Sequence, residues 1–465
     1  MTRPGPRRGS PRARGRRVVV TGLGVVSSLG SDRRSFWRAC LAGESVVEPV
    51  PEAWHRYASL RSRVWSPLRP WERDTPLVSR AEGRRLDATS RMALLAAEEA
   101  LAAAGLALEP VDRKRATFRL PQLAPEGCGV FLGTGVGGIG SLLEGAAHTM
   151  LHDAKGRIAQ VRDALRDGHR QALDEVLAAL PAPPVFNPFA VAMTMPNAAA
   201  ANLAIKLGLH GPCRTFACAC ASGTVAIGQA FRAVRRGECE AAVAGGSEHL
   251  SDPYGAVFRG FDAVGALAQG PLPPERVNRP FDRSRSGFLF AEGGAAILVL
   301  EELAAARARR APILAEVVGY GETCDAHDVM AMDPSGRQIR RALEDCLADA
   351  GLAPADVGYV NAHGTGTPRN DPVECAVLGE IFGPEVPVSS TKSLLGHTLG
   401  ASGALEAAAT ALTLHHGRAH PNRNLDDPIA DLAFLRQATA LPVHHAVTQS
   451  FAFGGQNAVL ALARL

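Results

Sequence analysis

One cysteine in a run of small residues is the first candidate for chemistry in this chain. Cys220 lies in FACACASG, residues 216–223, after a strand-like stretch and before a helical pattern that ends at Arg235-Arg236-Gly237. A cysteine where a helix begins faces unpaired backbone N–H groups and the positive end of the helix dipole, which favour the thiolate. Because free cysteines are usually small core residues, this motif alone leaves a nucleophile and a core residue equally open.

Two further motifs place a histidine where an apolar run gives way to a loop. The segment VGYVNAHGTGTP, residues 357–368, ends its strand pattern at His363, and VSSTKSLLGHT, residues 388–398, carries Lys392 and His397. A single loop histidine is more often structural than catalytic. Two of them, together with a cysteine between a strand and a helix, indicate a site for nucleophilic catalysis.

In order and spacing, these motifs resemble those of elongating β-ketoacyl-acyl-carrier-protein synthases. The matching segments are CACASG at 218–223, NAHGTGT at 361–367, KSLLGH at 392–397 and FAFGGQN at 451–457. The resemblance covers roughly residues 17 to 465. It implies an α/β fold of the thiolase-like, duplicated type, in which two βαβ-rich halves form a layered α-β-α-β-α architecture. It also implies a dimer and carbon–carbon bond formation by decarboxylative Claisen condensation.

The chemistry of such a condensation accounts for the residue types. The acyl group must first be held covalently, and a thiolate at Cys220 is a strong nucleophile and later a good leaving group. Loss of CO₂ from a malonyl unit then builds negative charge on a thioester oxygen. Neutral imidazoles at His363 and His397 can stabilise that enolate by donating N–H hydrogen bonds to it. We therefore expect these three residues to be catalytic.

The resemblance assigns roles to three further residues. Lys392 is expected to be catalytic, with Glu406 as its supporting partner in orienting a histidine. Phe453 is expected to supply a backbone N–H to the tetrahedral oxyanion and an aromatic ring that gates the site. Without the resemblance, these residues would be interpreted as a surface lysine, a helical glutamate and a core phenylalanine.

Length and composition favour a large enzyme built from two halves. The chain has 465 residues, enough for about three domains, but the motifs run through one repeated architecture. We expect residues 17–306 to form an N-terminal half that carries the nucleophile. Residues 307–465 should form a C-terminal half with the two histidines and the lysine, with the seam near 307–312. The two halves have diverged too far for simple matching of the sequence to show the duplication.

The first residues form a distinct basic segment. Residues 1–17 carry seven arginines and no acid, whereas the whole chain has a formal net charge of +4, so the remainder is net negative. Because the segment is also rich in Pro and Gly, residues 1–16 are expected to be a disordered tail. A nucleic-acid-binding arm is conceivable from this composition. Nothing in the rest of the chain supports it, so no nucleic-acid partner is expected.

Cysteine usage and hydropathy indicate the compartment and the partners. Nine cysteines without a secretory signal favour a reducing, cytoplasmic location. No metal or cofactor is expected, because no second ligand cluster accompanies the neighbouring cysteines. No segment reaches the eighteen or so apolar residues that a membrane span requires.

The expected partners are an acyl carrier protein bearing acyl and malonyl groups and a second ketosynthase subunit, identical or related. A carrier dock could include Arg232, Arg235 and Arg236.

Two insertions distinguish the chain from compact members of the family. One spans about residues 54–85, and the other spans residues 140–187. The second has apolar positions that predict an amphipathic helix or helix pair on the surface, namely Ile158, Val161, Leu165, Leu173 and Val176. The sequence leaves open the length and the saturation of the acyl chain. It also leaves open whether the enzyme serves primary fatty-acid synthesis or specialised polyketide or polyene synthesis. An alternative is a chain-length-determining partner of a heterodimeric polyketide ketosynthase, but such partners lack the nucleophile that Cys220 provides.

Overall fold

The ten strands of the large sheet in the computed structural model fall into two sets of five. The structure describes residues 15–79, 82–83, 85–165, 167–180, 182 and 187–465, so the predicted tail at 1–16 lies almost wholly outside the described residues. The first set is β1 (Val18–Val26), β6 (Cys128–Gly133), β7 (Cys213–Phe216), β8 (Ala241–His249) and β9 (Gly293–Glu302). The second set is β10 (Ala315–Cys324), β11 (Tyr359–Asn361), β12 (Val388–Ser389), β15 (His445–Phe451) and β16 (Gln456–Ala463).

The two sets repeat one topology. The strand order is β12-β11-β15-β16-β10 followed by β1-β9-β8-β6-β7, and β1 pairs antiparallel with β10 where the sets meet. In each set the second strand from the outer edge lies parallel to its neighbours, as in β7-β6-β8 and β12-β11-β15. The remaining pairs are antiparallel. This repeat confirms the duplicated α/β fold, which the sequence alone could not demonstrate.

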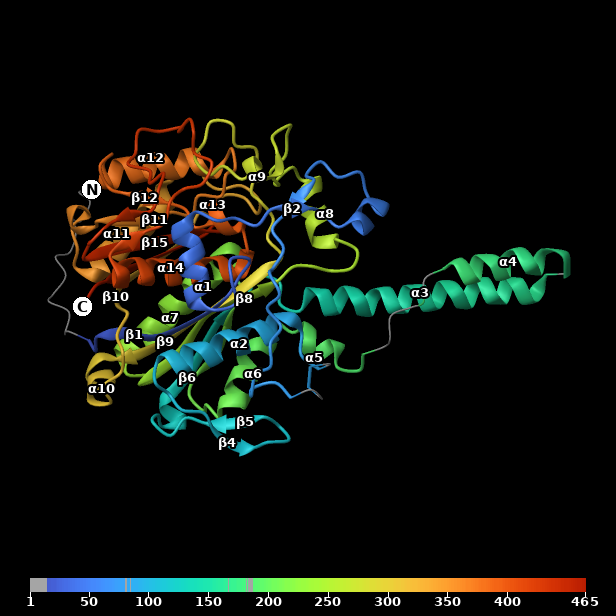
Figure 1. Ribbon diagram of the computed structural model, residues 1–465, viewed down its shortest axis with the longest axis horizontal. Coiled ribbons are helices and arrows are strands. Elements are labelled where there is room, and N and C mark those ends of the chain that lie inside the picture. Colours follow the sequence, from blue (N-terminus) through green and yellow to red (C-terminus); the bar gives the residue numbers. More distant parts are fainter. Residues whose placement is uncertain (1–14, 80–81, 84, 166, 181, 183–186) are drawn as a thin grey trace, which may run out of the picture.

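Two central helices separate the two sets of strands. Both α7 (Ser222–Arg236) and α14 (Ser402–His416) contact strands of each set and are largely buried. On the outer faces, α2 (Ala88–Ala103) covers β1, β8 and β9, while α11 (Arg337–Ala350) covers β10 and β16. Strands covered on both faces read as continuous apolar runs, as β1 does with all of its residues buried. The predicted α-β-α-β-α layering is confirmed (Figure 1).

The central helices approach each other through glycines. A Cβ added at Gly403 would lie 2.0 Å from the Thr224 hydroxyl oxygen, and one at Gly223 would lie 2.6 Å from the Ala404 backbone nitrogen. Each helix is preceded by a short 3₁₀ turn, η3 (Ala219–Ala221) or η5 (Leu399–Ala401). The first residue of each turn has a positive φ, 44° at Ala219 and 46° at Leu399. The segments ASG at 221–223 and at 401–403 therefore occupy equivalent places in the two halves.

Smaller elements complete the body. They are α1 (Arg33–Ala42), β2 (Glu48–Pro49), η1 (Glu52–Arg56), β3 (Val64–Trp65), β4 (Glu109–Asp112), β5 (Thr117–Arg119), η2 (Pro125–Gly127), α5 (Ala190–Thr194), α6 (Ala198–Leu207), α8 (Ala256–Ala263), α9 (Pro274–Val277), α10 (Leu303–Ala308), η4 (Pro354–Asp356), α12 (Asn370–Phe382), α13 (Lys392–Leu395), β13 (Arg418–Ala419) and β14 (Thr439–Ala440). None of the helices in the described ranges is long and apolar enough to span a bilayer.

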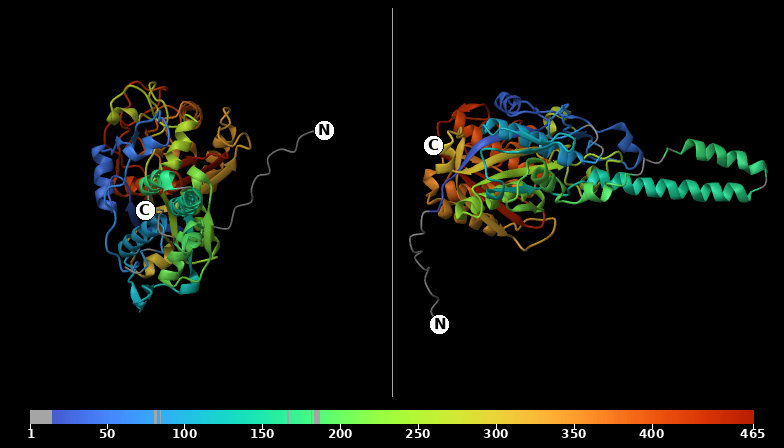
Figure 2. Two further views of the ribbon diagram at one scale, coloured as in Figure 1. Left: turned by 90° about the vertical axis from the view of Figure 1, so that its right-hand side faces the viewer. Right: turned by 90° about the horizontal axis from the view of Figure 1, so that it is seen from below.

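The two insertions fold differently from each other. The first contains a small aromatic core, because buried Trp54 packs against Trp65 at 5.1 Å and Phe258 at 5.3 Å between ring centroids. The second forms a helical hairpin of α3 (Ile139–Ala164) and α4 (Asp167–Ala179), which confirms the predicted helix pair. The hairpin projects far beyond the body in Figure 1 and in the right-hand view of Figure 2.

Candidate active site

The predicted catalytic residues lie where strands of the two halves end. Cys220 is in η3 after β7, and His363 follows β11 by two residues. Lys392 begins α13 after β12, and His397 follows that helix. All four side chains are buried, with 2–3 % of each residue exposed. The structure therefore brings together residues that are separated by up to 177 positions in the sequence.

A tight turn presents the cysteine. The positive φ of 44° at Ala219 reverses the chain between β7 and α7, a conformation that costs a non-glycine residue energy and that is often found at functional sites. The Ser222 hydroxyl accepts a hydrogen bond from the Cys218 N–H at 2.8 Å and stabilises this turn. Helix α7 then runs to Arg236 and ends at Gly237 in the left-handed conformation, as the sequence predicts.

His397 directs a ring nitrogen at the cysteine. Its Nε2 lies 3.0 Å from Cys220 Sγ. Its Nδ1 accepts a hydrogen bond from the Leu399 N–H at 3.3 Å. Since Nδ1 is an acceptor, the neutral ring carries its proton on Nε2. Phe288 packs edge-on against the ring at 5.2 Å and helps to hold its orientation.

Lys392 fixes the same tautomer in His363 that Leu399 fixes in His397. The ammonium donates to His363 Nδ1 at 3.0 Å and to the His363 carbonyl oxygen at 2.9 Å. The proton of the neutral ring is therefore on Nε2 here as well. The two imidazole rings are perpendicular, with centroids 5.7 Å apart. Both histidines line the cavity that contains Cys220, so the pair can supply two N–H donors to one substrate oxygen.

A buried ion pair supports this arrangement. Lys392 Nζ pairs with Glu406 Oε1 at the start of α14, and both side chains are 1–2 % exposed. Burial raises the pKa of Glu406 to about 7, against the opposing effect of Lys392. Burial and the Lys392 charge hold the pKa of His363 and His397 well below the usual range. Both imidazoles are therefore neutral at physiological pH, as the sequence analysis expects of donors to an enolate.

The resting cysteine differs from the sequence-based expectation. Burial raises the pKa of Cys220 to about 12, although Lys392 and the backbone N–H groups of Phe453 and Cys220 itself favour the thiolate. The position at the start of a helix predicts the opposite shift, so that prediction is wrong in this structure. Desolvation of the sulfur outweighs the helix terminus, because charge in a low-dielectric site is costly. The thiol proton must therefore leave as the sulfur attacks.

A cavity of about 450 Å³ leads to these groups. Its buried lining includes Cys220 and the two histidines, and its exposed lining includes Val264, Gly265, Met330, Pro368 and Arg369. Phe453 also lines the cavity, and its ring stacks on Phe261 with 6.0 Å between centroids. The ring is partly exposed, which places it where it can contact an acyl chain on Cys220.

Sequence reasoning missed two buried carboxylates beside the site. Glu374 accepts hydrogen bonds from the N–H groups of His363 at 2.7 Å and Gly364 at 2.8 Å. It also accepts from Asn370 Nδ2 at 2.9 Å and Gln449 Nε2 at 2.6 Å. Its position in the first turns of α12 resembles an ordinary acidic residue near a helix N-terminus, so the sequence carries no distinct signal for this role.

Glu248 connects the two loops behind the cysteine and His397. It accepts hydrogen bonds from the Thr134 hydroxyl at 3.0 Å, the Val136 N–H at 3.2 Å, the Gly400 N–H at 3.1 Å and the Gly135 N–H. Burial raises its pKa to about 7. Its segment GGSE, residues 245–248, also resembles the sequence of this family, but that match specifies no role for the glutamate.

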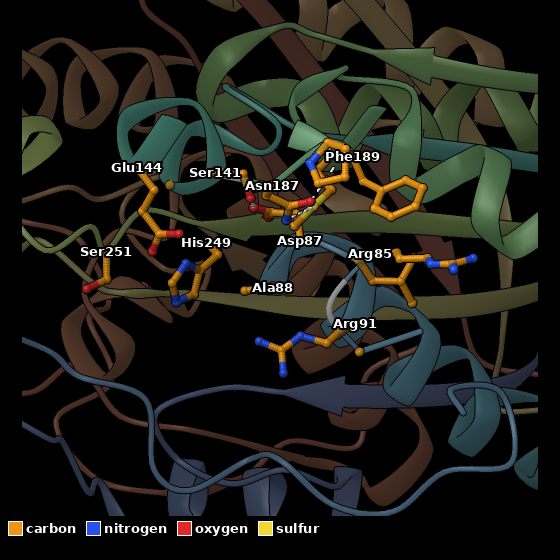
Figure 3. A pocket seen from close by; sticks show the side chains of 15 residues that line it. Arg85, Asp87, Ala88, Arg91, Ser141, Glu144, Asn187, Phe189, His249 and Ser251 are labelled. Atoms are coloured by element: carbon orange, nitrogen blue, oxygen red, sulfur yellow. Dashed lines mark hydrogen bonds between the residues drawn. The ribbon is translucent and has the colours of Figure 1, made fainter. Parts of the chain in front are cut away.

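A second cavity, of about 900 Å³, lies at the base of the hairpin (Figure 3). None of the predicted site residues lines it. Three of its charged groups have partners: Asp87 accepts from the Ser141 hydroxyl at 2.6 Å, Arg91 pairs with Glu72 at 2.6 Å, and Arg85 stacks on Phe189 at 4.6 Å. We therefore place the reaction in the smaller cavity.

The three arginines predicted for a carrier dock are occupied elsewhere. Arg235 forms a bidentate ion pair with Asp349 at 2.9 and 3.1 Å, and Arg232 stacks on the ring of Tyr320 at 4.5 Å. Arg236 lies 3.9 Å from Glu238. They also lie at the far end of α7, about 20 Å from Cys220 at 1.5 Å per residue. This part of the prediction is therefore not supported by the structure.

Comparisons with known proteins agree with the fold and with this arrangement. Residues 15–306 match the family described as beta-ketoacyl synthase, N-terminal domain, and residues 314–426 match its C-terminal domain. A relative from Synechocystis sp., 3-oxoacyl-[acyl-carrier-protein] synthase 2, is 35 % identical over 452 residues, covering 96 % of this chain and 97 % of that protein.

Two solved structures are similar over almost the whole length. A beta-ketoacyl synthase from Burkholderia phymatum has a TM-score of 0.79 and 32 % identity, covering 97 % of this chain and 100 % of that one. The ishigamide ketosynthase/chain length factor has a TM-score of 0.76 and 28 % identity, with the same coverage. The fold and the site thus define a condensing enzyme of the thiolase-like class. The chain belongs to the beta-ketoacyl synthase family and is an acyltransferase.

Proposed function

We propose that Cys220 carries the acyl group in a decarboxylative Claisen condensation. An acyl thioester and malonyl-acyl carrier protein would give a 3-oxoacyl-acyl carrier protein and CO₂. The observation that carries the proposal is the convergence of Cys220 Sγ, His397 Nε2 at 3.0 Å and His363 on one cavity. Both imidazoles have Nδ1 occupied, which leaves Nε2–H available to the substrate.

The first half-reaction transfers the acyl group. Cys220 Sγ attacks the thioester carbonyl, and the carbon–sulfur bond to the carrier breaks. The proton of the Cys220 thiol ends on the departing thiol, so no net charge is left in the buried site. The backbone N–H groups of Cys220 and Phe453 are directed at this sulfur. We assign them to the oxyanion of the tetrahedral intermediate, where losing one donor typically raises the barrier by about 2.7–4 kcal/mol.

The second half-reaction releases CO₂ and forms the new bond. The carbon–carboxylate bond of the malonyl unit breaks, and its electron pair forms an enolate whose oxygen accepts from His363 and His397 Nε2–H. Lys392 acts through His363, since its Nζ contacts Nδ1 at 3.0 Å, and Glu406 offsets the lysine charge. The enolate carbon then attacks the Cys220 thioester carbonyl. Collapse of the second tetrahedral intermediate breaks its bond to Cys220 Sγ, and the released thiolate takes up one proton from solvent to restore the thiol.

The mouth of the cavity suits a carrier-bound substrate. Buried Thr365, half-buried Thr367 and exposed Arg369 line the cavity, and their hydroxyl and guanidinium groups can hydrogen-bond a phosphopantetheine arm. Arg61 lies beside it, because its guanidinium nitrogen would be 3.6 Å from a Cβ placed at Gly265. Arg61 and Arg369 are exposed cations and can attract an acidic carrier protein. We assign the carrier contact to this mouth in place of the α7 arginines.

We also propose that the chain works with a second ketosynthase subunit. Strand β7 forms the outer edge of its set of strands, with Cys213 and Arg214 exposed. An unpaired edge strand offers backbone N–H and C=O groups to another chain. The partner can be an identical copy or a related subunit, as in the ketosynthase/chain length factor named above. The complete site argues against a chain-length-determining role for this chain, which would require no nucleophile.

Two coarser assignments complete the proposal. We divide the chain into an N-terminal half at 17–306 and a C-terminal half at 307–465, supported by the repeated strand order. A cytoplasmic location is supported by nine free cysteines, of which Cys213 and Cys324 are exposed, because exposed thiols persist in reducing compartments. Elongation in primary fatty-acid or in specialised polyketide synthesis fits the site equally well.

Intact-protein mass spectrometry tests the proposed nucleophile. We expect incubation with acyl-carrier-protein thioesters to add one acyl group at Cys220, located by peptide mapping. Cys220→Ala should abolish both the adduct and condensation, whereas Cys218→Ala should leave most activity, because Cys218 is half-buried and outside the histidine pair. Equal losses in the two variants would refute the assignment.

A further inference from the structure

The turn beside His397 adopts a strained conformation. Leu399, the first residue of η5, has a positive φ of 46°, which a non-glycine residue keeps only where its surroundings hold it. In this turn the Leu399 N–H donates to His397 Nδ1 at 3.3 Å, and this hydrogen bond leaves the ring proton on Nε2. The geometry of η5 therefore decides which ring nitrogen of His397 presents a proton to the cavity.

The two halves of the chain hold their equivalent turns by different groups. In η3 the Ser222 hydroxyl accepts a hydrogen bond from the Cys218 N–H at 2.8 Å and supports the positive φ at Ala219. Ser402 occupies the same place after η5, but its hydroxyl lies 3.4 Å from Glu406 Oε1. The support of η5 must therefore come from another residue.

Glu248 reaches η5 from the end of strand β8. The residue is 0 % exposed, and its Oε2 accepts hydrogen bonds from the Gly400 N–H at 3.1 Å and from the Gly135 N–H. Its Oε1 accepts from the Thr134 hydroxyl at 3.0 Å and from the Val136 N–H at 3.2 Å. Each carboxylate oxygen therefore has two donors, and one of the four donors belongs to η5.

The carboxylate contacts the backbone of both loops directly. A Cβ added at Gly400 would lie 2.3 Å from Glu248 Oε2, and one at Gly135 would lie 2.6 Å from the same oxygen, so neither position has room for a side chain. The loop after β6 is itself anchored, because the Thr134 N–H donates to the Phe216 carbonyl oxygen at 3.1 Å. This loop is therefore a fixed support, and Glu248 connects η5 to it.

The N–H groups on the two sides of the Leu399 Cα atom have different partners. The Leu399 N–H binds His397 Nδ1, and the next N–H, that of Gly400, binds Glu248. Only the φ and ψ angles of Leu399 lie between these two groups. Without the Glu248 contact the strained turn can relax, and the Leu399 N–H then rotates away from the imidazole.

We propose that Glu248 is a positioning residue for the decarboxylation step. By binding the Gly400 N–H, it holds η5 so that the Leu399 N–H keeps the proton of His397 on Nε2, where an enolate oxygen can accept a hydrogen bond from it. The inference rests on the enolate role proposed for His397. It adds a residue that acts through the backbone of η5 and that the family resemblance leaves without a role.

A comparison in two backgrounds separates positioning from a general structural effect. Glu248→Leu has a similar shape but no acceptor, and it is measured with His397 present and in a His397→Ala chain. We expect release of labelled CO₂ from malonyl thioester to fall at least tenfold when His397 is present, since one aimed donor is worth about 10²- to 10³-fold in rate. Without His397, the same substitution should change the rate less than about twofold. An equal fall in both backgrounds, or no fall in either, would overturn the proposal.

A matched substitution controls for the loss of a buried carboxylate. Glu248 pairs with Gly294 of β9, and buried Glu301 lies seven residues further along that strand, about 24 Å at 3.4 Å per residue. Glu301→Leu should lower the free energy of unfolding and leave CO₂ release unchanged, and a comparable fall in rate would overturn the proposal. If Glu248→Leu does not fold, Glu248→Asp keeps the charge but withdraws it from Gly400, and the same comparison applies: a fall with His397 present and none without it.

The tautomer of His397 gives a readout that needs no turnover. NMR of isotope-labelled histidine distinguishes a protonated Nε2 from a protonated Nδ1, and His397→Ala identifies the signal. We expect Nε2–H alone in the unmodified chain and both tautomers in Glu248→Leu, and an unchanged tautomer would overturn the proposal. Absence of CO₂ release from the unmodified chain would instead refute the proposed function and leave the tautomer result valid.

Discussion

Replacing Lys392 by methionine tests whether the buried lysine acts through His363. Its ammonium contacts His363 Nδ1 at 3.0 Å and the His363 carbonyl oxygen at 2.9 Å, and it pairs with Glu406. Removing one member of a buried ion pair typically costs about 3–5 kcal/mol, against a total stability of about 5–15 kcal/mol for most domains. We therefore expect a large loss of stability in denaturant unfolding.

A double variant separates this structural cost from catalysis. Lys392→Met with Glu406→Gln removes both charges, so no uncompensated charge stays buried, and most of the lost stability should return. His363 would still lack the donor that fixes its tautomer, and its Nε2–H would no longer be held toward the substrate. Since one aimed donor is worth about 2.7–4 kcal/mol, we expect decarboxylation to fall about 10²- to 10³-fold.

Two assays on the double variant give the decisive comparison. Release of labelled CO₂ from malonyl thioester measures enolate formation, and mass spectrometry after a single turnover measures acylation of Cys220. We expect CO₂ release to fall while acylation stays within a few-fold of the unmodified enzyme, because His363 is not within hydrogen-bond reach of the sulfur in any contact described above. A stable double variant that releases CO₂ at the original rate would refute the role of Lys392.

Two further predictions concern the cavity mouth and the loops behind the cysteine. Arg61→Glu with Arg369→Glu should raise the KM for carrier-bound substrates several-fold and leave that for pantetheine thioesters unchanged, whereas Arg236→Glu should alter neither; a uniform loss of kcat would contradict the docking role. For Glu248, the carboxyl holds its proton up to about pH 7 when folded but only to about 4.5 when unfolded, so its contribution to the unfolding free energy falls as pH rises between these values. The stability difference between the unmodified chain and Glu248→Gln should shift accordingly in urea titrations at pH 5 and 7, and a shift of the opposite sign would refute the assigned pKa.

Local patterns predicted the elements that carry the site. The helix after Cys220 ends where the sequence places Gly237, because only a residue tolerant of left-handed φ fits there. The strands before His363 and Lys392 form as predicted, but they end earlier, at Asn361 and Ser389. Which chemistry the residues perform came from the family resemblance, since neither histidine motif alone excludes a structural role.

Properties that depend on packing could not be read from the sequence. The pKa of Cys220 follows from desolvation by side chains of both halves, so the helix start gave the wrong sign. Glu248 binds backbone N–H groups of two loops that are each more than a hundred residues away, and Glu374 binds those of His363 and Gly364. No local sequence pattern predicts these contacts. The α7 arginines were assigned by charge alone, whereas Arg235 pairs with Asp349, more than a hundred residues away.

The two halves of the chain share one topology, but only the first half has a cysteine in the turn before its central helix. Gly400 occupies the place in η5 that Cys220 occupies in η3, and a Cβ there would lie 2.2 Å from the Gly135 backbone nitrogen. The second half therefore has no space for a nucleophile at the equivalent position. With Cys220 as the proposed nucleophile, one chain would hold one acyl thioester, so the number of acyl groups per assembly would count its cysteine-bearing subunits. Two per pair would identify two identical chains, and one per pair would identify a partner without a nucleophile.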